Sequence, residues 1–137
     1  MADSVRVRAD ILEEMLLHAR RESRMECCGL LAGRDGVITA IFPATNALSS
    51  ATAYEIAPRE LFELFRTLRK RELAHLGQYH SHLATQNVPS PTDIEQAGYP
   101  DQAYFIVSPQ AGAPRSIRAF SICAGFVREL NIELVNF

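Results

Sequence analysis

The sequence predicts an α/β (α+β) fold, a mixed β-sheet flanked by helices, formed as one domain over residues 1–137. Strand-like and helix-like patterns follow one another in the order β-α-β-β-α-β-α-β-β-β, which indicates a sheet with helices packed on it. The continuous apolar run at residues 103–108 is typical of a strand buried on both faces. A chain of 137 residues can bury a substantial core without disulfides.

In the amino-terminal part, period-two and helical patterns alternate. Val5 and Val7 alternate with arginines and predict a short edge strand. The first helix follows, with Asp10 and Glu13 as its capping box and a buried stripe formed by Ile11, Leu12, Met15, Leu16 and Ala19. Around a tight turn at residues 33–36, a hairpin is expected to pair residues 28–32 with residues 37–42.

The remaining elements are predicted by proline, glycine and alternation. Pro58 begins the second helix, whose buried face is expected to be Leu61, Phe62, Leu64, Phe65 and Leu68. Residues 74–82 predict a buried strand with a polar end, and Gly77 would let a neighbouring backbone approach it closely. A turn is expected at residues 109–114, and after it a closing hairpin formed by residues 116–123 and 126–135.

Composition excludes several classes of protein. Fourteen basic and sixteen acidic residues give a net charge of −2, so nothing favours nucleic acid as a partner. The sequence contains no apolar run long enough for a membrane span and no signal-peptide core at its start, which predicts a cytoplasmic protein. Three cysteines, two of them adjacent, indicate buried thiols in a reducing compartment rather than disulfides.

The polar end of the strand at residues 74–82 carries two histidines. Residues two apart on a strand face the same side, so His80 and His82 would present their imidazoles together. Eleven positions after His82, Asp93 lies in the first turn of a short helix that Ser90 and Pro91 begin. Two neutral imidazoles and one carboxylate form a three-ligand zinc set with an open fourth position, which is the catalytic pattern.

Each half of this pattern has a simpler interpretation. His-x-His can be two polar residues at a strand end, and Ser-x-x-Asp can be a capping box without a metal. A hydrolytic zinc site also needs a base for its water, and Glu26 enters a buried strand, where a carboxylate is poorly solvated. Glu26 alone would be interpreted as a surface residue at a strand end, but the three features together favour a metal site.

These residues resemble the JAMM (MPN-plus) zinc metallopeptidase family, in particular its short stand-alone bacterial members. The resemblance rests on Glu26 before C-G-L-L-x-G, on H-S-H at residues 80–82 and on S-x-x-D at residues 90–93. Asn46 and the segment 54–58 also fit, so that the likeness covers nearly the whole chain. It implies the MPN fold, a curved mixed sheet with flanking helices, related to the cytidine-deaminase-like architecture.

The resemblance implies a zinc-dependent peptide or isopeptide hydrolase. His80, His82 and Asp93 would hold Zn²⁺, with water as the fourth ligand. Glu26 would take a proton from the water and pass it to the leaving amine. Ser90 would donate a hydrogen bond to the oxyanion while also capping its helix. These roles are expectations that the resemblance carries over to matching positions.

The substrate that the resemblance implies is the C-terminal tail of a ubiquitin-like or sulfur-carrier protein. Such an extended tail could lie beside an exposed sheet edge, held by main-chain hydrogen bonds. One departure from the family pattern is Leu83, which stands where the family usually has proline after the second histidine. This change affects the rigidity of the loop and leaves every expected metal ligand in place.

Three other functions can be compared with the hydrolase. A zinc deaminase requires H-x-E and P-C-x-x-C, which the chain lacks. A cupin-type site requires a glutamate shortly after H-x-H, where Gln86 and Asn87 stand. The serious alternative is a non-catalytic MPN scaffold that mediates protein contacts. Members of that kind typically lack the metal ligands that this chain retains, and metal analysis of the purified protein would separate the two classes.

Overall fold

The computed structural model of the protein describes residues 3–110 and 115–137. Its elements occur in the predicted order: β1 (Ser4–Arg8), α1 (Ala9–Arg21), β2 (Cys28–Arg34), β3 (Val37–Ala44), α2 (Pro58–Lys70), β4 (Ala74–Ser81), α3 (Pro91–Gln96), β5 (Ala103–Val107), β6 (Ile117–Cys123) and β7 (Phe126–Val135). The turn predicted at residues 109–114 falls largely on residues 111–114, which lie outside the described residues.

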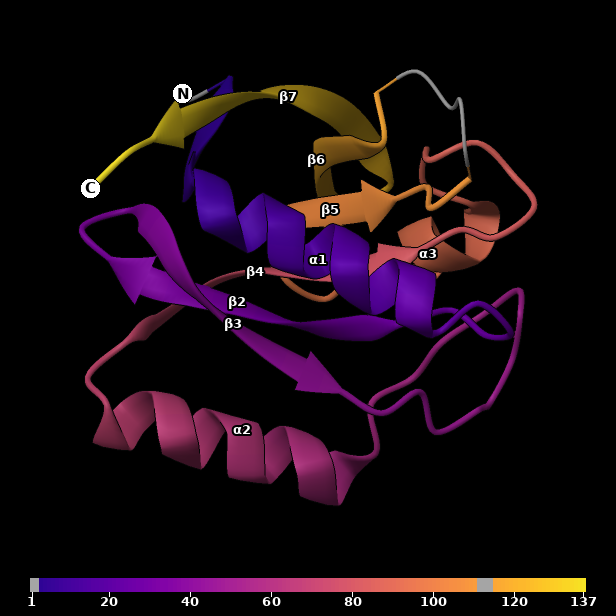
Figure 1. Cartoon of the computed structure of the whole chain (residues 1–137), viewed down its shortest axis with the longest axis horizontal. Helices are drawn as coiled ribbons and strands as arrows, with labels where there is room; N and C mark the ends of the chain where they lie inside the picture. The colour runs from indigo at the N-terminus through magenta and orange to yellow at the C-terminus, as the bar shows by residue number, and fades with distance from the viewer. Residues whose placement is uncertain (1–2, 111–114) are drawn as a thin grey trace.

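The strands form one mixed sheet that closes on itself in the order β1-β3-β2-β4-β5-β6-β7. Parallel pairing joins β1 to β3 and β7 and joins β4 to β5, and the other neighbours are antiparallel. The prediction that β1 is an edge strand is therefore wrong, because β1 has a partner on each side: β3 at Arg6 and Val7, and β7 along residues 4–8. Figure 1 shows β1 and β7 together beside both ends of the chain.

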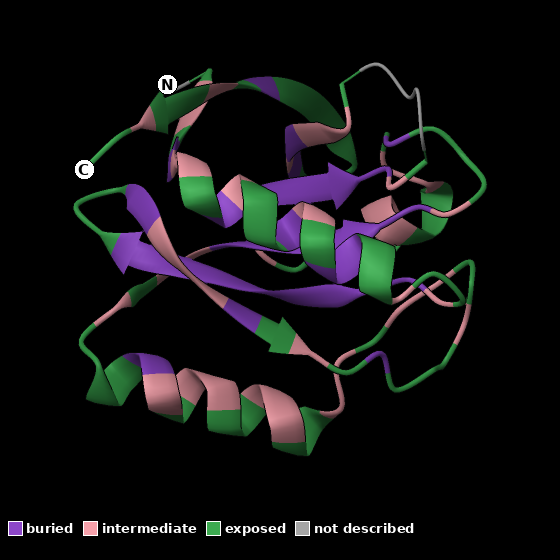
Figure 2. Cartoon of the chain, in the orientation of Figure 1, coloured by how far each residue is buried: buried purple, intermediate pink, exposed green. Residues whose placement is uncertain are grey.

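The two long helices pack on opposite faces of the sheet (Figure 1). The core around α1 contains Ile11, Met15 and Ala19 from the predicted stripe, with strand residues that include Tyr79 and Phe105. α2 packs more loosely over β2 and β3, where Leu68 is its one buried residue, and Figure 2 shows the rest of the helix as exposed or half-buried. The predicted buried face of α2 is wrong at Phe62, which is 61% exposed because it points away from the sheet.

The helix starts differ in how they are capped. Pro58 occupies the first turn of α2 and Ser90 is the N-cap of α3, as predicted. The capping box predicted for the first helix is wrong, because α1 begins at Ala9 and its N-cap residue, Arg8, makes no side-chain cap. The Asp10 carboxylate accepts instead from the Arg8 guanidinium, at 2.6 Å.

Two glycines let the strands that carry the site approach their neighbours. A Cβ atom on Gly77 would lie 2.7 Å from the main-chain oxygen of Ala103 in β5, which confirms the close approach predicted there. A Cβ atom on Gly29 would lie 2.5 Å from the Tyr79 ring. Both distances are shorter than a carbon atom tolerates, so β2, β4 and β5 can pack this closely only around glycine.

The three cysteines differ in exposure. Cys27 and Cys28 are buried free thiols, as predicted, and burial raises the pKa of Cys27 to about 11. The expectation that Cys123 is buried is wrong, because it ends β6 on the exposed side of the β6–β7 turn. Within the described part of the chain, no helix is long and apolar enough to cross a membrane.

Candidate metal centre and active site

The end of strand β4 places two imidazoles together, His80 within the strand and His82 directly after its last residue, Ser81. Its burial increases along the strand, so its final residues lie deep in the protein, and His80 and His82 are 1% and 3% exposed. The alternation of the strand turns both rings to the same side, while Ser81 faces β2. The Nε2 atoms of the two histidines lie 3.2 Å apart.

The third donor comes from the start of α3. Asp93 Oδ2 lies 3.1 Å from Nε2 of His80 and 3.0 Å from Nε2 of His82. The capping box of α3 fixes this carboxylate, because Ser90 N–H donates to the same Oδ2 atom at 2.9 Å. The structure thus brings together the three residues that the sequence predicted as metal ligands.

The spacing of these three donors fits a metal ion. In a tetrahedral zinc site with ligand bonds of about 2.0–2.1 Å, neighbouring donor atoms are about 3.3 Å apart. The observed separations of 3.0, 3.1 and 3.2 Å are close to that value. Two imidazole nitrogens and a carboxylate oxygen also match the donors that zinc takes in catalytic sites.

Neighbouring groups set the orientation and charge of the ligands. His82 Nδ1 donates to the main-chain oxygen of Gln86 at 2.8 Å, which leaves the lone pair on Nε2 for a metal. Burial lowers the pKa of His80 and so keeps this imidazole neutral. Burial would raise the pKa of Asp93, but in the chain without metal, where the pKa of His82 is raised, hydrogen bonding to His80 and His82 outweighs it and holds the pKa of Asp93 far below its usual range. Asp93 therefore carries a negative charge, as an anionic metal ligand would.

Glu26 lies two residues before β2 and is buried, and its carboxyl is close enough to His82 and Asp93 to interact with them electrostatically. Its side chain is 4% exposed, and among the described residues its Oε1 atom has no hydrogen-bond partner. Burial raises the pKa of Glu26 to about 7, an effect that proximity to His82 partly opposes. A carboxyl group with a pKa near neutrality can both accept and release a proton at working pH, as a general base requires.

Ser90 has two available functions. Its Oγ accepts the main-chain N–H of Asp93 at 3.1 Å, as an N-cap does. Because a hydroxyl can accept and donate at once, the Ser90 O–H remains available to a substrate oxygen.

Tyr54 and Gln86 contribute to the site although the sequence assigned them no role. The Tyr54 ring stacks on His80 with ring centroids 4.5 Å apart and an interplanar angle of 24°. Tyr54 belongs to the segment 54–58, whose fit to the family pattern was a sequence signal that could have identified this residue. Gln86 contributes only its main-chain carbonyl, which no side-chain pattern could reveal.

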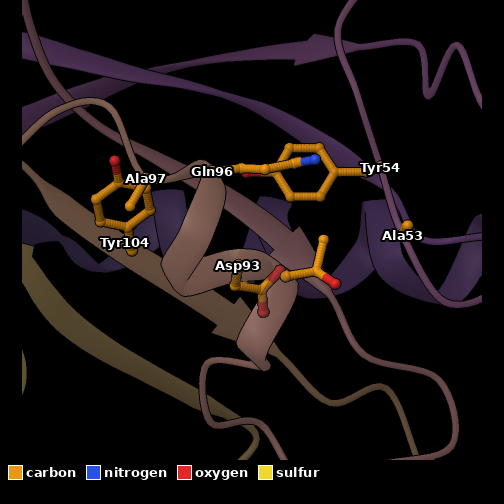
Figure 3. Close-up of a pocket in the computed structure, with 7 residues that line it drawn as sticks. Ala53, Tyr54, Asp93, Gln96, Ala97 and Tyr104 are labelled. Carbon is orange, nitrogen blue, oxygen red and sulfur yellow. The ribbon is translucent and has the colours of Figure 1, made fainter. Parts of the chain in front are cut away.

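A narrow slot leads to the carboxylate of Asp93. Figure 3 shows Tyr54 and Ala53 on one side and α3 on the other, with the Gln96 side chain reaching towards the Tyr54 ring. The free volume is about 20 Å³, which is room for a single water molecule. Small side chains at Ala53 and Ala97 form part of its walls. As it stands, the slot therefore has room for a water molecule beside Asp93 and none for a side chain.

Fold and site together define a metallohydrolase-type domain, in which three convergent donors lie beside a buried carboxyl group. The chain belongs to the family described as prokaryotic homologs of the JAB domain, whose model matches residues 8–123. This match confirms the expected JAMM/MPN-plus family and its fold.

Individual relatives agree with this assignment. The chain is 35% identical to the CysO-cysteine peptidase of Mycobacterium tuberculosis over 94% of its own length and 90% of the relative's. It is 36% identical to a desampylase of Haloferax volcanii, over 74% and 78% of the two chains. A solution structure of a Desulfitobacterium hafniense protein superposes with a TM-score of 0.86 at 33% identity, covering 97% of this chain and 94% of that one.

Proposed function

We propose that the protein is a zinc-dependent peptide or isopeptide hydrolase that cleaves the C-terminal tail of a ubiquitin-like or sulfur-carrier protein from a group attached to it. The convergence of His80, His82 and Asp93 beside buried Glu26 is the observation that carries this proposal. The names of two relatives, a CysO-cysteine peptidase and a desampylase, support the same class of substrate. A non-catalytic scaffold would have no use for such a cluster.

The residues of the chain divide the reaction between them. His80, His82 and Asp93 would hold zinc, which as a Lewis acid activates water for attack on an amide carbonyl. Glu26 accepts the proton that the attacking water loses and transfers it to the leaving amine as the C–N bond breaks. Ser90 donates its hydroxyl proton in a hydrogen bond to the carbonyl oxygen, where negative charge develops.

The substrate tail is proposed to lie in the slot between Tyr54 and α3. A tail beside a sheet edge could not pair with β4 itself, because β4 is bordered by β2 on one side and β5 on the other. Because the slot has only about 20 Å³ of free space, the tail would have to widen it on binding, and glycine residues before the scissile bond would require the least widening. Gln96 and Asp93 line the slot that the tail would enter (Figure 3).

The cytoplasm is the compartment in which we infer that the protein works. Cys27, Cys28 and Cys123 are free thiols, which a reducing compartment preserves. The exposed Cys123 is the thiol most open to oxidation elsewhere.

A carrier protein joined to cysteine through its C-terminal Gly-Gly tail tests the proposed function. The zinc-loaded protein should release free cysteine from this adduct, as measured by mass spectrometry of the intact carrier. Glu26→Gln is the matched control, because it should retain zinc and lose about 10²–10⁴-fold in rate. An intact adduct alongside cleavage of an unrelated peptide would refute the substrate and leave the hydrolase. Normal turnover by Glu26→Gln would refute Glu26 as the base.

A further inference from the structure

The side chain of Glu26 forms no hydrogen bond with any residue that the structure describes, so no such bond fixes its direction. Its Oε1 atom is buried and has no partner among the residues that the structure describes. A base must nevertheless stay within hydrogen-bond reach of the water that it activates. The direction of the carboxylate therefore depends on how firmly the main chain of residues 26 and 27 is held.

Four hydrogen bonds hold that stretch of main chain. Glu26 N–H donates to the Ser50 carbonyl at 2.9 Å, and the Asn46 side-chain amide donates to the Glu26 carbonyl at 3.0 Å. Cys27 N–H donates to the Ser81 hydroxyl at 2.8 Å, and Ser81 N–H donates to the Cys27 carbonyl at 3.1 Å. The first two bonds tie Glu26 to the loop before α2, and the last two tie it to β4.

The Ser81 hydroxyl takes the place of a main-chain carbonyl in the sheet. Cys28 faces His80 in the antiparallel register of β2 and β4, so Cys27 and Ser81 form the next pair. In a regular ladder such a pair would exchange two main-chain hydrogen bonds. Here one of them is present, and the other is made by the side chain of Ser81, which is 0% exposed.

We propose that Ser81 is a positioning residue, whose hydroxyl fixes the base Glu26 relative to the two histidines of β4. Ser81 stands between His80 and His82 in sequence but turns to the opposite side of the strand, where it contacts the residue that follows Glu26. It is thus a side-chain link between the base and the strand that carries two ligands. This inference rests on the proposed function only in assigning Glu26 as the base.

The Ser81→Ala variant tests this proposal. A displacement of about 1 Å near a reacting centre can cost about 10²-fold in rate, so we expect a kcat lower by roughly tenfold to a hundredfold, with KM and zinc content little changed. Ser81→Thr retains the hydroxyl on the same carbon and should restore most of kcat. Asn46 is a poorer test residue, because its side chain also binds the carbonyl of Ala53 and the amide of Glu55 in the neighbouring loop.

A double-mutant cycle separates positioning from general structural damage. In the Glu26→Gln background the base is already absent, so Ser81→Ala should cause no further loss if the serine acts through Glu26. An equal loss in both backgrounds would overturn the proposal, because Ser81 would then act on the ligands or on the fold. Wild-type turnover in Ser81→Ala, or loss of zinc, would overturn it as well.

A structural measurement tests the link without using activity. In crystals of zinc-loaded Ser81→Ala, the Glu26 carboxylate should move by about 1 Å relative to His80 and His82, and the Cys27 amide should exchange with solvent faster than in the wild type. An unmoved carboxylate would overturn the proposal. If the wild type cleaves no conjugate, the proposed function fails, but these two measurements still decide whether Ser81 holds Glu26 in place.

Discussion

Replacing Glu26 with glutamine should stabilise the metal-free protein at neutral and higher pH. Burial raises the pKa of this carboxyl from 4.5 to about 7. Between these two values the folded chain binds more protons than the unfolded chain, so the free energy of unfolding falls as pH rises through this window. The difference between the two pKa values corresponds to about 3 kcal/mol of stability lost once the pH exceeds about 8. Glutamine is neutral at every pH and avoids this loss.

Urea denaturation with a chelator present, at pH 5 and pH 8, measures this effect. The free energy of unfolding of Glu26→Gln should exceed that of the wild type by up to about 3 kcal/mol at the higher pH, and the difference should shrink towards the lower one. Glu13→Gln, which changes an exposed glutamate on α1, is the matched control and should leave both values nearly unchanged. A gain for Glu26→Gln that is the same at both pH values would refute the reasoning, because the titration of Glu26 would not be its source.

The remaining predictions concern the metal, α2 and the close approach of strands. His82→Ala should lose most of the bound zinc in a metal analysis, because two protein ligands hold the ion poorly, and retention of one zinc per chain would contradict the site. Leu68→Ala should lower the free energy of unfolding by about 2–5 kcal/mol, because Leu68 is buried. Phe62→Ser should change this free energy by less than about 0.5 kcal/mol, because Phe62 is exposed. Equal losses for the two variants in urea denaturation would contradict the orientation of α2. Gly29→Ala should lower the melting temperature because its methyl group would overlap the Tyr79 ring, and an unchanged melting temperature would show that the strands can separate there.

The order of the helices and strands could be predicted because each hydrophobic pattern depends only on the residues of its own segment. Alternation identified β1, but only the pairing of its residues with β7, more than a hundred positions away, decides that the strand is not an edge. Helical spacing likewise placed Phe62 in the apolar stripe of α2, and the docking angle of the helix decides that this ring faces outwards. Such outcomes depend on contacts between distant segments, which a local pattern does not contain.

The candidate site was predicted more fully than the closure of the sheet. Strand alternation places His80 and His82 on one side, and the capping sequence places Asp93 in the first turn of α3, so both halves of the site are locally encoded. The residues that orient these ligands were less visible. Gln86 takes part through its main-chain carbonyl, so its side chain gives no signal in the sequence. The stacking of Tyr54 on His80 depends on the path of the loop before α2, which no local pattern predicts.

Helix α3 is capped by the same Asp93 oxygen that lies beside the two histidines of the candidate metal site. The helix has six residues, none of them buried, and a helix this short is marginal without tertiary support. Its support is the cap formed by Ser90 and Asp93, and Asp93 Oδ2 is also the oxygen that faces the two histidines. A metal bound at this oxygen, as proposed, would therefore be thermodynamically linked to the formation of α3, and any effect of one on the other would be reciprocal. Gln96 and Ala97 of this helix also line the slot, so the shape of the proposed tail site depends on the same cap.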